Sequence, residues 1–194
     1  KFINKKLGNS INKIRNVFEP GCNDGCNLYP FMINKFNVFG CDYDKNSINV
    51  GNKYNLNLAH GGIETLIKLN IKADLIILSH ILAHIPNLKE FIYKIKSLMH
   101  KDTIIYIETP GLLSWLQTDY KIKKYSKNYK SNNNILSFLQ LDFCYIFTSY
   151  TIDNLLKKYG FIKIYSDELI RGLYQMDIFF DSNAESSISI ENKY

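Results

Sequence analysis

Near the N-terminus, acidic residues and glycines follow directly on two short apolar segments. Segment 15–19 ends in Glu19 and leads into the loop 21–25, which reads Gly-Cys-Asn-Asp-Gly, and segment 37–42 ends in Asp42. Glycine in such a loop lets the backbone approach a ligand closely, because it has no Cβ. An acid about twenty residues further on can bond both ribose hydroxyls, and Asp42 stands at that spacing from Gly21. We therefore expect a ligand site where these two segments end.

Two nucleotide-binding patterns use this layout, and the chain fits one of them better. A dinucleotide site carries Gly-x-Gly-x-x-Gly, but the second and third glycines would fall on Asn23 and Cys26. The pattern acid-x-Gly-x-Gly-x-Gly is met by Glu19, Gly21 and Gly25. Asn23 departs from it mildly, because Asn tolerates positive φ better than most residues. A carboxylate at position 19 suits a cationic ligand and would repel a pyrophosphate; the alternative is a tight turn that binds nothing.

Two histidines are placed where they could move a proton. His80 and His84 are four residues apart, so a helix would put them on one face. Imidazole titrates near neutral pH and is the usual general base for a hydroxyl. A zinc-protease motif would need Glu where the chain has Ile81, so we expect no metal site. Tyr145 and Tyr150 are lesser candidates for the base, and the alternative for His84 is a structural role.

Strands and helices alternate along the part of the chain that must position these residues. Strands are expected at 15–19, 37–42, 56–60, 74–79 and 103–108, and helices at 26–35, 45–55, 63–69 and 87–100. A further helix begins at Thr148 or Ser149 and ends before Gly160. Two last strands, 161–169 and 173–180, are joined by a turn at Arg171 and Gly172. The pattern predicts an α/β, Rossmann-like fold: a seven-stranded, mostly parallel sheet with an antiparallel C-terminal edge pair and helices on both faces.

Residues 1–180 are expected to form one domain. Residues 112–148 break the alternation, and we interpret them as an insertion that packs over the end of the sheet and shapes the substrate pocket. The polar residues 181–194 are interpreted as a loose tail.

Composition narrows the class of protein further. The formal net charge is +6, which favours anionic partners such as phosphates, but the lysines are scattered and do not indicate nucleic-acid binding. The four cysteines form no Cys-x-x-Cys pair, which favours a reduced, cytoplasmic protein without a zinc finger. No apolar run reaches the length of a membrane span, and no signal peptide is expected.

Four segments together resemble the class I S-adenosylmethionine (SAM) dependent methyltransferases. They are 17–25 (VFEPGCNDG), 38–44 (VFGCDYD), 74–85 (DLIILSHILAHI) and 105–111 (IYIETPG), and the exit 158–161 (KYGF) is also typical. Within that family the chain is most similar to the branch of sugar, polysaccharide and ubiquinone-type methyltransferases. SAM carries an ammonium and a sulfonium but no phosphate, which agrees with a carboxylate at position 19.

The resemblance implies a role for each matching position. Glu19, Gly21 and Asn23 would border the methionine part of SAM, and Gly25 would belong to the same cofactor-binding loop. Asp42 would hold the ribose, and Ser79 and His80 would lie beside the sulfonium. Tyr43, Ile63 and Glu64 would lie near the adenine. Besides Asn23, two positions depart from the family: Ala83 stands where a Glu usually precedes the second histidine, and Phe143 where members often have a histidine.

Three functions remain open at this point. The first is methyl transfer from SAM to a small-molecule or glycan acceptor, such as a nucleotide-sugar or a surface polysaccharide. The second is a nucleic-acid methyltransferase, although the fourth strand ends in Ser79-His80 and the Asn/Asp-Pro-Pro-Tyr motif is missing. The third is a non-catalytic SAM-binding domain of a larger protein, which the departures at Asn23, Ala83 and Phe143 motivate. The oligomeric state is left open.

Overall fold

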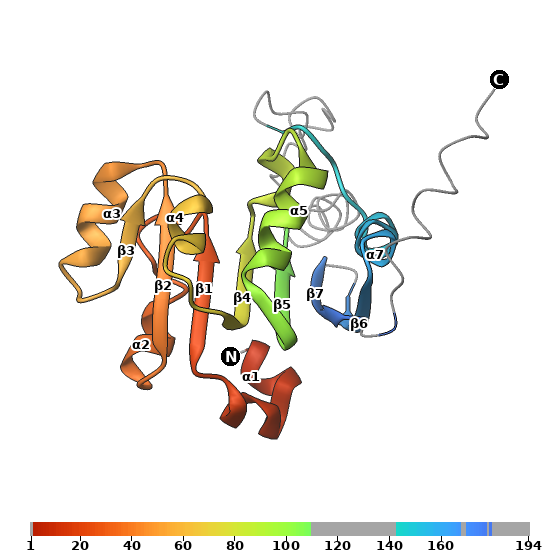
Figure 1. Ribbon diagram of the computed structural model, residues 1–194, viewed down its shortest axis with the longest axis horizontal. Helices are drawn as coiled ribbons and strands as arrows, with labels where there is room; N and C mark the ends of the chain where they lie inside the picture. The colour runs from red at the N-terminus through yellow and green to blue at the C-terminus, as the bar shows by residue number, and fades with distance from the viewer. Residues whose placement is uncertain (1, 110–142, 168–169, 178, 180–194) are drawn as a thin grey trace, which may run out of the picture.

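The computed structural model describes residues 2–109, 143–167, 170–177 and 179. In that part of the chain, seven strands form one sheet in the order β3-β2-β1-β4-β5-β7-β6 (Figure 1). The strands are β1 (Asn16–Pro20), β2 (Asn37–Asp42), β3 (Leu58–His60), β4 (Ala73–Ser79), β5 (Met99–Glu108), β6 (Phe161–Ser166) and β7 (Arg171–Met176). The α-helices are α1 (Phe2–Leu7), α2 (Tyr29–Ile33), α3 (Lys45–Asn52), α4 (Glu64–Ile67), α5 (Leu88–Ser97) and α7 (Ser149–Lys158). Two 3-10 helices are η1 (Gly8–Lys13) and η2 (Leu82–His84).

The expected strand directions are confirmed. Strands β1 to β5 pair in parallel, and β7 is antiparallel to both β5 and β6. Because the five parallel strands run the same way, their carboxyl ends meet at one edge of the sheet. That edge holds Glu19, Asp42 and Ser79, which are three of the residues expected to bind a ligand there.

The expected turn at Arg171 and Gly172 is wrong. Both residues lie in β7, where they pair with Glu108 and Ile107 of β5. The chain turns just before them: Ile170 has φ 53°, and its N–H donates to the carbonyl of Asp167 at 3.0 Å. The carboxylate of Asp167 also accepts from the backbone N–H of Arg171, at 3.1 Å. These hydrogen bonds to Asp167 end the turn before Arg171. The sequence Arg-Gly by itself did not indicate that position.

Several helix bounds differ from the sequence expectation. The helix expected at 26–35 is shortened to α2, with Pro30 in its first turn, where a missing N–H costs nothing. The expected helix 63–69 is shortened to α4, and β5 begins four residues earlier than expected. Asn87 caps α5 as expected, its side chain accepting from the N–H of Glu90. Helix α1 was not expected.

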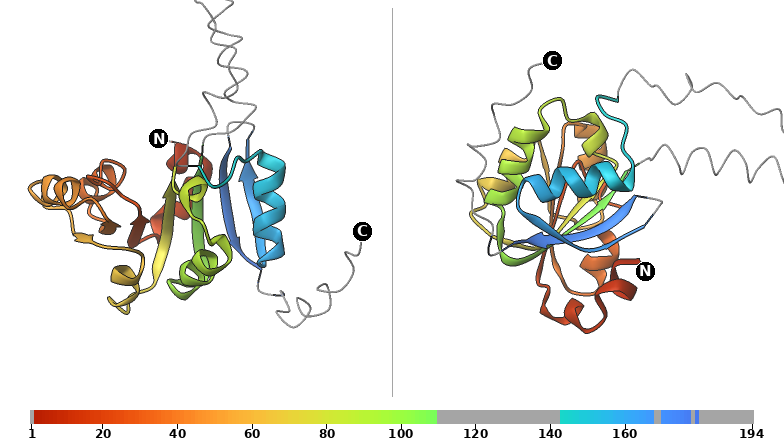
Figure 2. Two further views of the ribbon diagram at one scale, coloured as in Figure 1. Left: turned by 90° about the horizontal axis from the view of Figure 1, so that it is seen from above. Right: turned by 90° about the vertical axis from the view of Figure 1, so that its right-hand side faces the viewer.

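Helices lie on both faces of the sheet (Figures 1 and 2), and each face carries its own apolar layer. Alternate residues of a strand point to opposite faces. On one face, Val17 and Leu75 pack with residues of α1, α2 and α3. On the other, Phe18 and Ile76 pack with residues of α4, α5 and α7. All four strand residues are fully buried, so helices cover both faces as expected.

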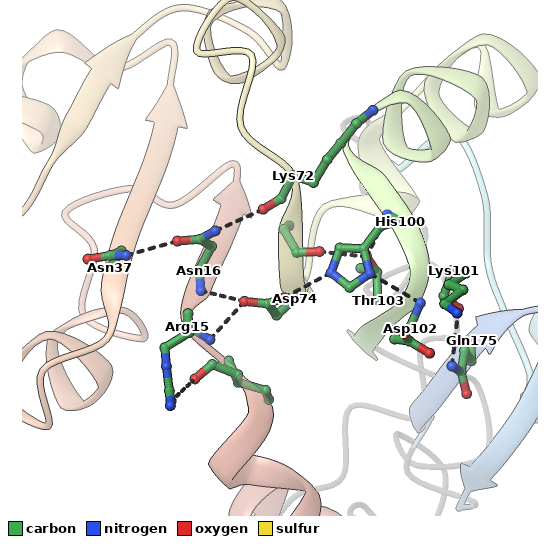
Figure 3. Close-up of polar contacts among 12 residues, drawn as sticks. Arg15, Asn16, Asn37, Lys72, Asp74, His100, Lys101, Asp102, Thr103 and Gln175 are labelled. Carbon is green, nitrogen blue, oxygen red and sulfur yellow. Dashed lines mark hydrogen bonds and ion pairs between the residues drawn. The ribbon is translucent and has the colours of Figure 1, made fainter.

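At the edge opposite the strand carboxyl ends, Asp74 joins three strands (Figure 3). Its Oδ2 accepts from the N–H groups of Arg15 and Asn16, both at 2.8 Å. Its Oδ1 lies 2.8 Å from Nε2 of His100. Burial opposes ionisation of Asp74, but these hydrogen bonds outweigh it and lower the pKa of the carboxyl. The start of β1 is thereby fixed to β4 and β5.

Among the described residues, no helix is both long enough and apolar enough to cross a membrane. The expected tail, 181–194, and residues 112–142 of the expected insertion lie outside the described part of the chain.

Candidate functional site

The loop between β1 and α2 has the backbone that its sequence suggested. Gly21, Asn23 and Gly25 have φ values of 70°, 51° and 78°. Asn23 therefore takes the left-handed conformation without being glycine. A Cβ on Gly21 would lie 2.7 Å from Cδ1 of Ile81, so a side chain there would have to displace Ile81. The loop is thus held close to the segment that follows β4.

Glu19 is a buried carboxyl group at the start of this loop. It is 1% exposed, and its Oε1 accepts from the side-chain amide of Asn27 at 2.8 Å. Among the described residues, its Oε2 is buried without any hydrogen-bond partner. Burial raises the pKa of Glu19 to about 8, although the Asn27 hydrogen bond opposes the shift. A buried, unpartnered carboxylate oxygen is costly unless a ligand supplies a donor or a positive charge.

Asp42 lies at the end of β2, directly beside the loop. Its Oδ2 accepts from the N–H of Asn23 at 2.9 Å, and its Oδ1 accepts from the N–H of Asp44 at 2.8 Å. The carboxylate therefore fixes the loop backbone, and each oxygen retains a lone pair for a ligand hydroxyl.

A cavity of about 320 Å³ opens beside Asp42. It brings together five of the residues expected from the sequence to bind the cofactor, namely Gly21, Asp42, Tyr43, Ile63 and Glu64. Residues 85–94, from α5 and the segment before it, close its other side. Its size is that of a small-ligand pocket.

Tyr43 and Glu64 converge over Gly62 in this cavity. A Cβ on Gly62 would lie 2.3 Å from the Tyr43 hydroxyl oxygen and 2.6 Å from Oε2 of Glu64. Lys94 of α5 forms ion pairs with both Glu64 and Glu90. Its hydrogen bond lowers the pKa of Glu64, which keeps that carboxylate ionised. Lys94 and Gly62 were not singled out in the sequence, because only the fold brings α5 next to α4.

Ser79 and His80 lie where β4 ends. Ser79 pairs with Glu108 of β5, and the N–H of His80 donates to the carbonyl of Glu108 at 2.7 Å. His80 has φ 55°, an uncommon conformation for a residue other than glycine. His84 lies on η2, and its ring centroid is 5.1 Å from that of Phe143. The structure therefore places the two histidines on different elements, His80 after β4 and His84 on η2.

The two positions that depart from the family pattern, Ala83 and Phe143, lie on segments that are bonded to each other. The backbone carbonyl of Ala83 accepts from the N–H of Cys144 at 2.7 Å, directly after Phe143. The hydroxyl of Tyr145 donates to the carbonyl of Pro86 at 3.0 Å. This segment is therefore joined to η2 through backbone groups, and Tyr145 is engaged in that contact.

A second cavity, of about 580 Å³, lies between the sheet, α1 and the loop that leads into α2. Ser79, Tyr106 and Glu108 line it from the strand ends, and Asn27 lines it from the loop. The Tyr106 hydroxyl donates to Oε2 of Glu108 at 2.6 Å. Glu108 is not among the site residues expected from the sequence. The available signal was that Glu108, like Glu19 and Asp42, is an acid at the carboxyl end of an apolar strand.

The described residues contain no group of three or more His, Cys, Asp or Glu arranged to hold a metal ion. The four cysteines are unpaired, with Cys22 and Cys41 buried and Cys26 and Cys144 exposed.

Comparison with known families distinguishes between the dinucleotide-binding and the SAM-binding pattern. Residues 2–165 match the family model described as a methyltransferase domain. The chain belongs to this methyltransferase family. The match confirms the expected class I SAM-dependent methyltransferase and its cofactor, whereas the sugar and ubiquinone branch stays a prediction. No curated protein is significantly similar in sequence.

Solved structures share the fold of this methyltransferase at low sequence identity. A SAM-dependent methyltransferase from Archaeoglobus fulgidus is 17% identical, with a TM-score of 0.56 over 83% of this chain and 68% of that one. A protein from Pyrococcus horikoshii OT3 is 15% identical, with a TM-score of 0.60 over 91% of each chain. Magnesium protoporphyrin IX methyltransferase from Synechocystis PCC 6803, solved with bound S-adenosylhomocysteine (SAH), is 15% identical, with a TM-score of 0.59 over 89% of this chain and 78% of that one.

Proposed function

We propose that this methyltransferase binds SAM across the carboxyl ends of β1, β2 and β4 and transfers its methyl group to a small-molecule or glycan acceptor. The observation that carries the proposal is Glu19, whose buried Oε2 lacks a partner at the start of the loop. The α-ammonium of SAM is a cation with several donors, and it would satisfy that oxygen. A dinucleotide would instead bring a pyrophosphate to the loop beside Glu19.

The other cofactor roles follow the placement of the residues. We assign the methionine part to Glu19, Gly21, Asn23 and Gly25, and the ribose hydroxyls to Asp42. The cavity beside Asp42 would hold the adenine, with Tyr43, Ile63 and Glu64 around it. Ser79 would lie nearest the reacting methyl group.

When bound, SAM supplies a methyl group that is already activated by the sulfonium. The chain then has to hold the acceptor in line and, for a hydroxyl acceptor, remove its proton. His80 and His84 are the bases proposed from the sequence. We favour His80, because its backbone adjoins both Ser79 and Glu108, whereas the ring of His84 lies against Phe143.

Calorimetry with SAH tests the cofactor assignment, because SAH retains the α-ammonium and the ribose. Glu19 is mostly protonated at neutral pH, since its pKa is raised to about 8. An ammonium placed against it would lower that pKa, so binding should release close to one proton at neutral pH. The release is measured as the dependence of the binding heat on the ionisation enthalpy of the buffer.

The matched variants are Glu19→Gln, which removes the titrating group, and Asp102→Asn, at the opposite end of the sheet. Glu19→Gln should bind SAH about tenfold more weakly or worse, with no proton release. Asp102→Asn should behave as the wild type. The absence of binding heat with millimolar SAH would refute the proposed function.

A further inference from the structure

We propose that the second cavity binds the methyl acceptor and that Glu108 selects an acceptor bearing an amine on an apolar body. The proposal rests on the proposed function, because it places the acceptor next to the SAM site. It goes further by naming the chemical class of the acceptor and the residue that recognises it.

The two cavities adjoin along two segments of the chain. Ser79 lines the second cavity, and Ile81, two residues later, lines the cavity beside Asp42. Likewise Gly21 lines the cavity beside Asp42, whereas Asn27, which hydrogen-bonds to Glu19, lines the second cavity. The ridge between the cavities is therefore formed by 79–81 and by the loop after β1. A methyl group near Ser79 would be reachable from the second cavity.

Side-chain alternation puts the relevant acids on one face of the sheet. Val17 and Tyr106 belong to the same apolar layer, so Glu19 and Glu108, each two residues further along its strand, point to that face too. Glu108 lines the second cavity directly. Because β4 and β5 are neighbours in register at Ser79 and Glu108, the carboxylate stands one strand away from the expected methyl position.

The second cavity has a mixed lining, in which aromatic and aliphatic side chains alternate with amides, hydroxyls and one charge. The rings of Phe2, Phe31 and Phe36 contribute to its walls. Among the described residues that line it, Glu108 is the single charged side chain, and there is no Lys or Arg. A site of this kind disfavours phosphates and carboxylates, including a nucleotide-sugar. It favours an ammonium attached to an apolar body.

Glu108 is held so that its charge is available to a ligand. Its neighbour across the sheet is Arg171, whose charge acts on Glu108 electrostatically. The hydrogen bonds of that guanidinium go to Asp167, at 2.6 Å from Nη2, and it lies over the ring of Phe2. The hydroxyl of Tyr106 donates to Oε2 of Glu108 and so fixes the carboxylate. Within the described residues, Oε1 of Glu108 has no hydrogen bond, which leaves it for the acceptor.

An amine held on Glu108 also needs no histidine base. One N–H proton of the ammonium passes to the Glu108 carboxylate, and the freed nitrogen lone pair forms the bond to the methyl carbon. The carbon–sulfur bond breaks with its electron pair remaining on sulfur, so the products are the methylated ammonium, neutral SAH and Glu108 carrying the proton, which it then releases to solvent.

Three probes that share a phenyl ring but differ in head group test this recognition. They are 2-phenylethylamine, 2-phenylethanol and 3-phenylpropionate, titrated by ligand-observed NMR into the protein saturated with SAH. We expect the amine to bind at least about tenfold more tightly than the alcohol, and the carboxylate more weakly than both. Glu108→Gln should reduce amine binding to the level of the alcohol while SAH affinity stays unchanged.

Two further variants guard against a folding effect. Tyr106→Phe removes the hydrogen bond but keeps the carboxylate, and should preserve the preference for the amine. Asp102→Asn, at the other end of β5, should change nothing. Equal binding of amine and alcohol, an unchanged preference in Glu108→Gln, or no binding of any probe would overturn the proposal. Failure to bind SAH would instead refute the proposed function.

Discussion

Glu19 is almost completely buried, and without a cation its ionisation lowers the stability of the fold. Its folded pKa of about 8 lies above the usual 4.5, so the folded state keeps a proton that the unfolded state loses. Stability of the ligand-free protein should therefore fall as pH rises from about 5 to about 8, by an amount on the order of a few kcal/mol. Glu19→Gln should lack this fall. Urea unfolding of both proteins across that range measures it, and parallel pH profiles would contradict it.

Glu19 and Asp42 should be separable by the part of the cofactor that each contacts. Asp42→Asn should weaken the binding of SAH and of 5′-methylthioadenosine equally, by about 1–3 kcal/mol, because both ligands carry the ribose. Glu19→Gln should weaken SAH alone, because methylthioadenosine has no ammonium. Calorimetry of the two ligands against the two variants gives the four affinities. A loss of methylthioadenosine binding in Glu19→Gln would contradict the assignment.

At the scale of elements, the hydrogen bonds of Asp74 (Figure 3) should stabilise the packing of β1 against β4 and β5. Asp74→Asn should lower the free energy of unfolding by about 1–3 kcal/mol at neutral pH, since two backbone donors lose a charged acceptor. The folded pKa of Asp74 is lowered from 3.8, so its contribution is complete above that value and is lost as pH falls further. The difference between wild type and variant should therefore shrink below about pH 4. Unfolding curves at neutral and acid pH test this, and a pH-independent difference would count against it.

Helix α7 begins with a reciprocal cap that should be detectable by mutation. The hydroxyl of Thr148 accepts from the N–H of Thr151, and the Thr151 side chain returns the contact to the backbone of Thr148. Thr148→Ala should therefore destabilise the protein by about 1 kcal/mol. Ser149→Ala, one residue later, is the control and should have little effect. Equal midpoints in urea for the two variants would show that the cap contributes nothing.

At the scale of the whole molecule, the net charge of +6 raises the question of nucleic-acid binding. A scattered basic excess gives weak, salt-sensitive binding, with a Kd of about 10⁻⁴–10⁻⁶ M at physiological salt. We expect gel shifts with duplex DNA and with RNA to disappear as salt rises, and SAH to have no effect on them. Tight binding that survives salt and strengthens with SAH would instead support a nucleic-acid acceptor.

The cofactor-binding residues could be predicted from the sequence where their pattern is contained in a short stretch of the chain. The loop 21–25 and Asp42 could be recognised because strand, glycine and acid follow one another along the chain. Glu108 carried one local signal, an acid at the carboxyl end of an apolar strand, but its proposed role depends on β5 lying beside β4 and on Arg171 hydrogen-bonding to Asp167. Helix α1 was missed for a similar reason: Phe2 packs against Tyr106 and Tyr165, which are distant in sequence. The misplaced turn at Arg171 likewise reflects a side-chain bond to Asp167.

The position of β7 has a consequence for how the polypeptide is made. This strand follows β6 along the chain but is inserted between β5 and β6, with Leu173 fully buried. During synthesis, one edge of β5 therefore stays unpaired until residues 171–176 have left the ribosome. Until then β6 also lacks the strand with which it pairs. A nascent chain stopped after Ser166 would expose the edge of β5 and should be a substrate for chaperones, whereas one extended beyond Met176 should close the sheet.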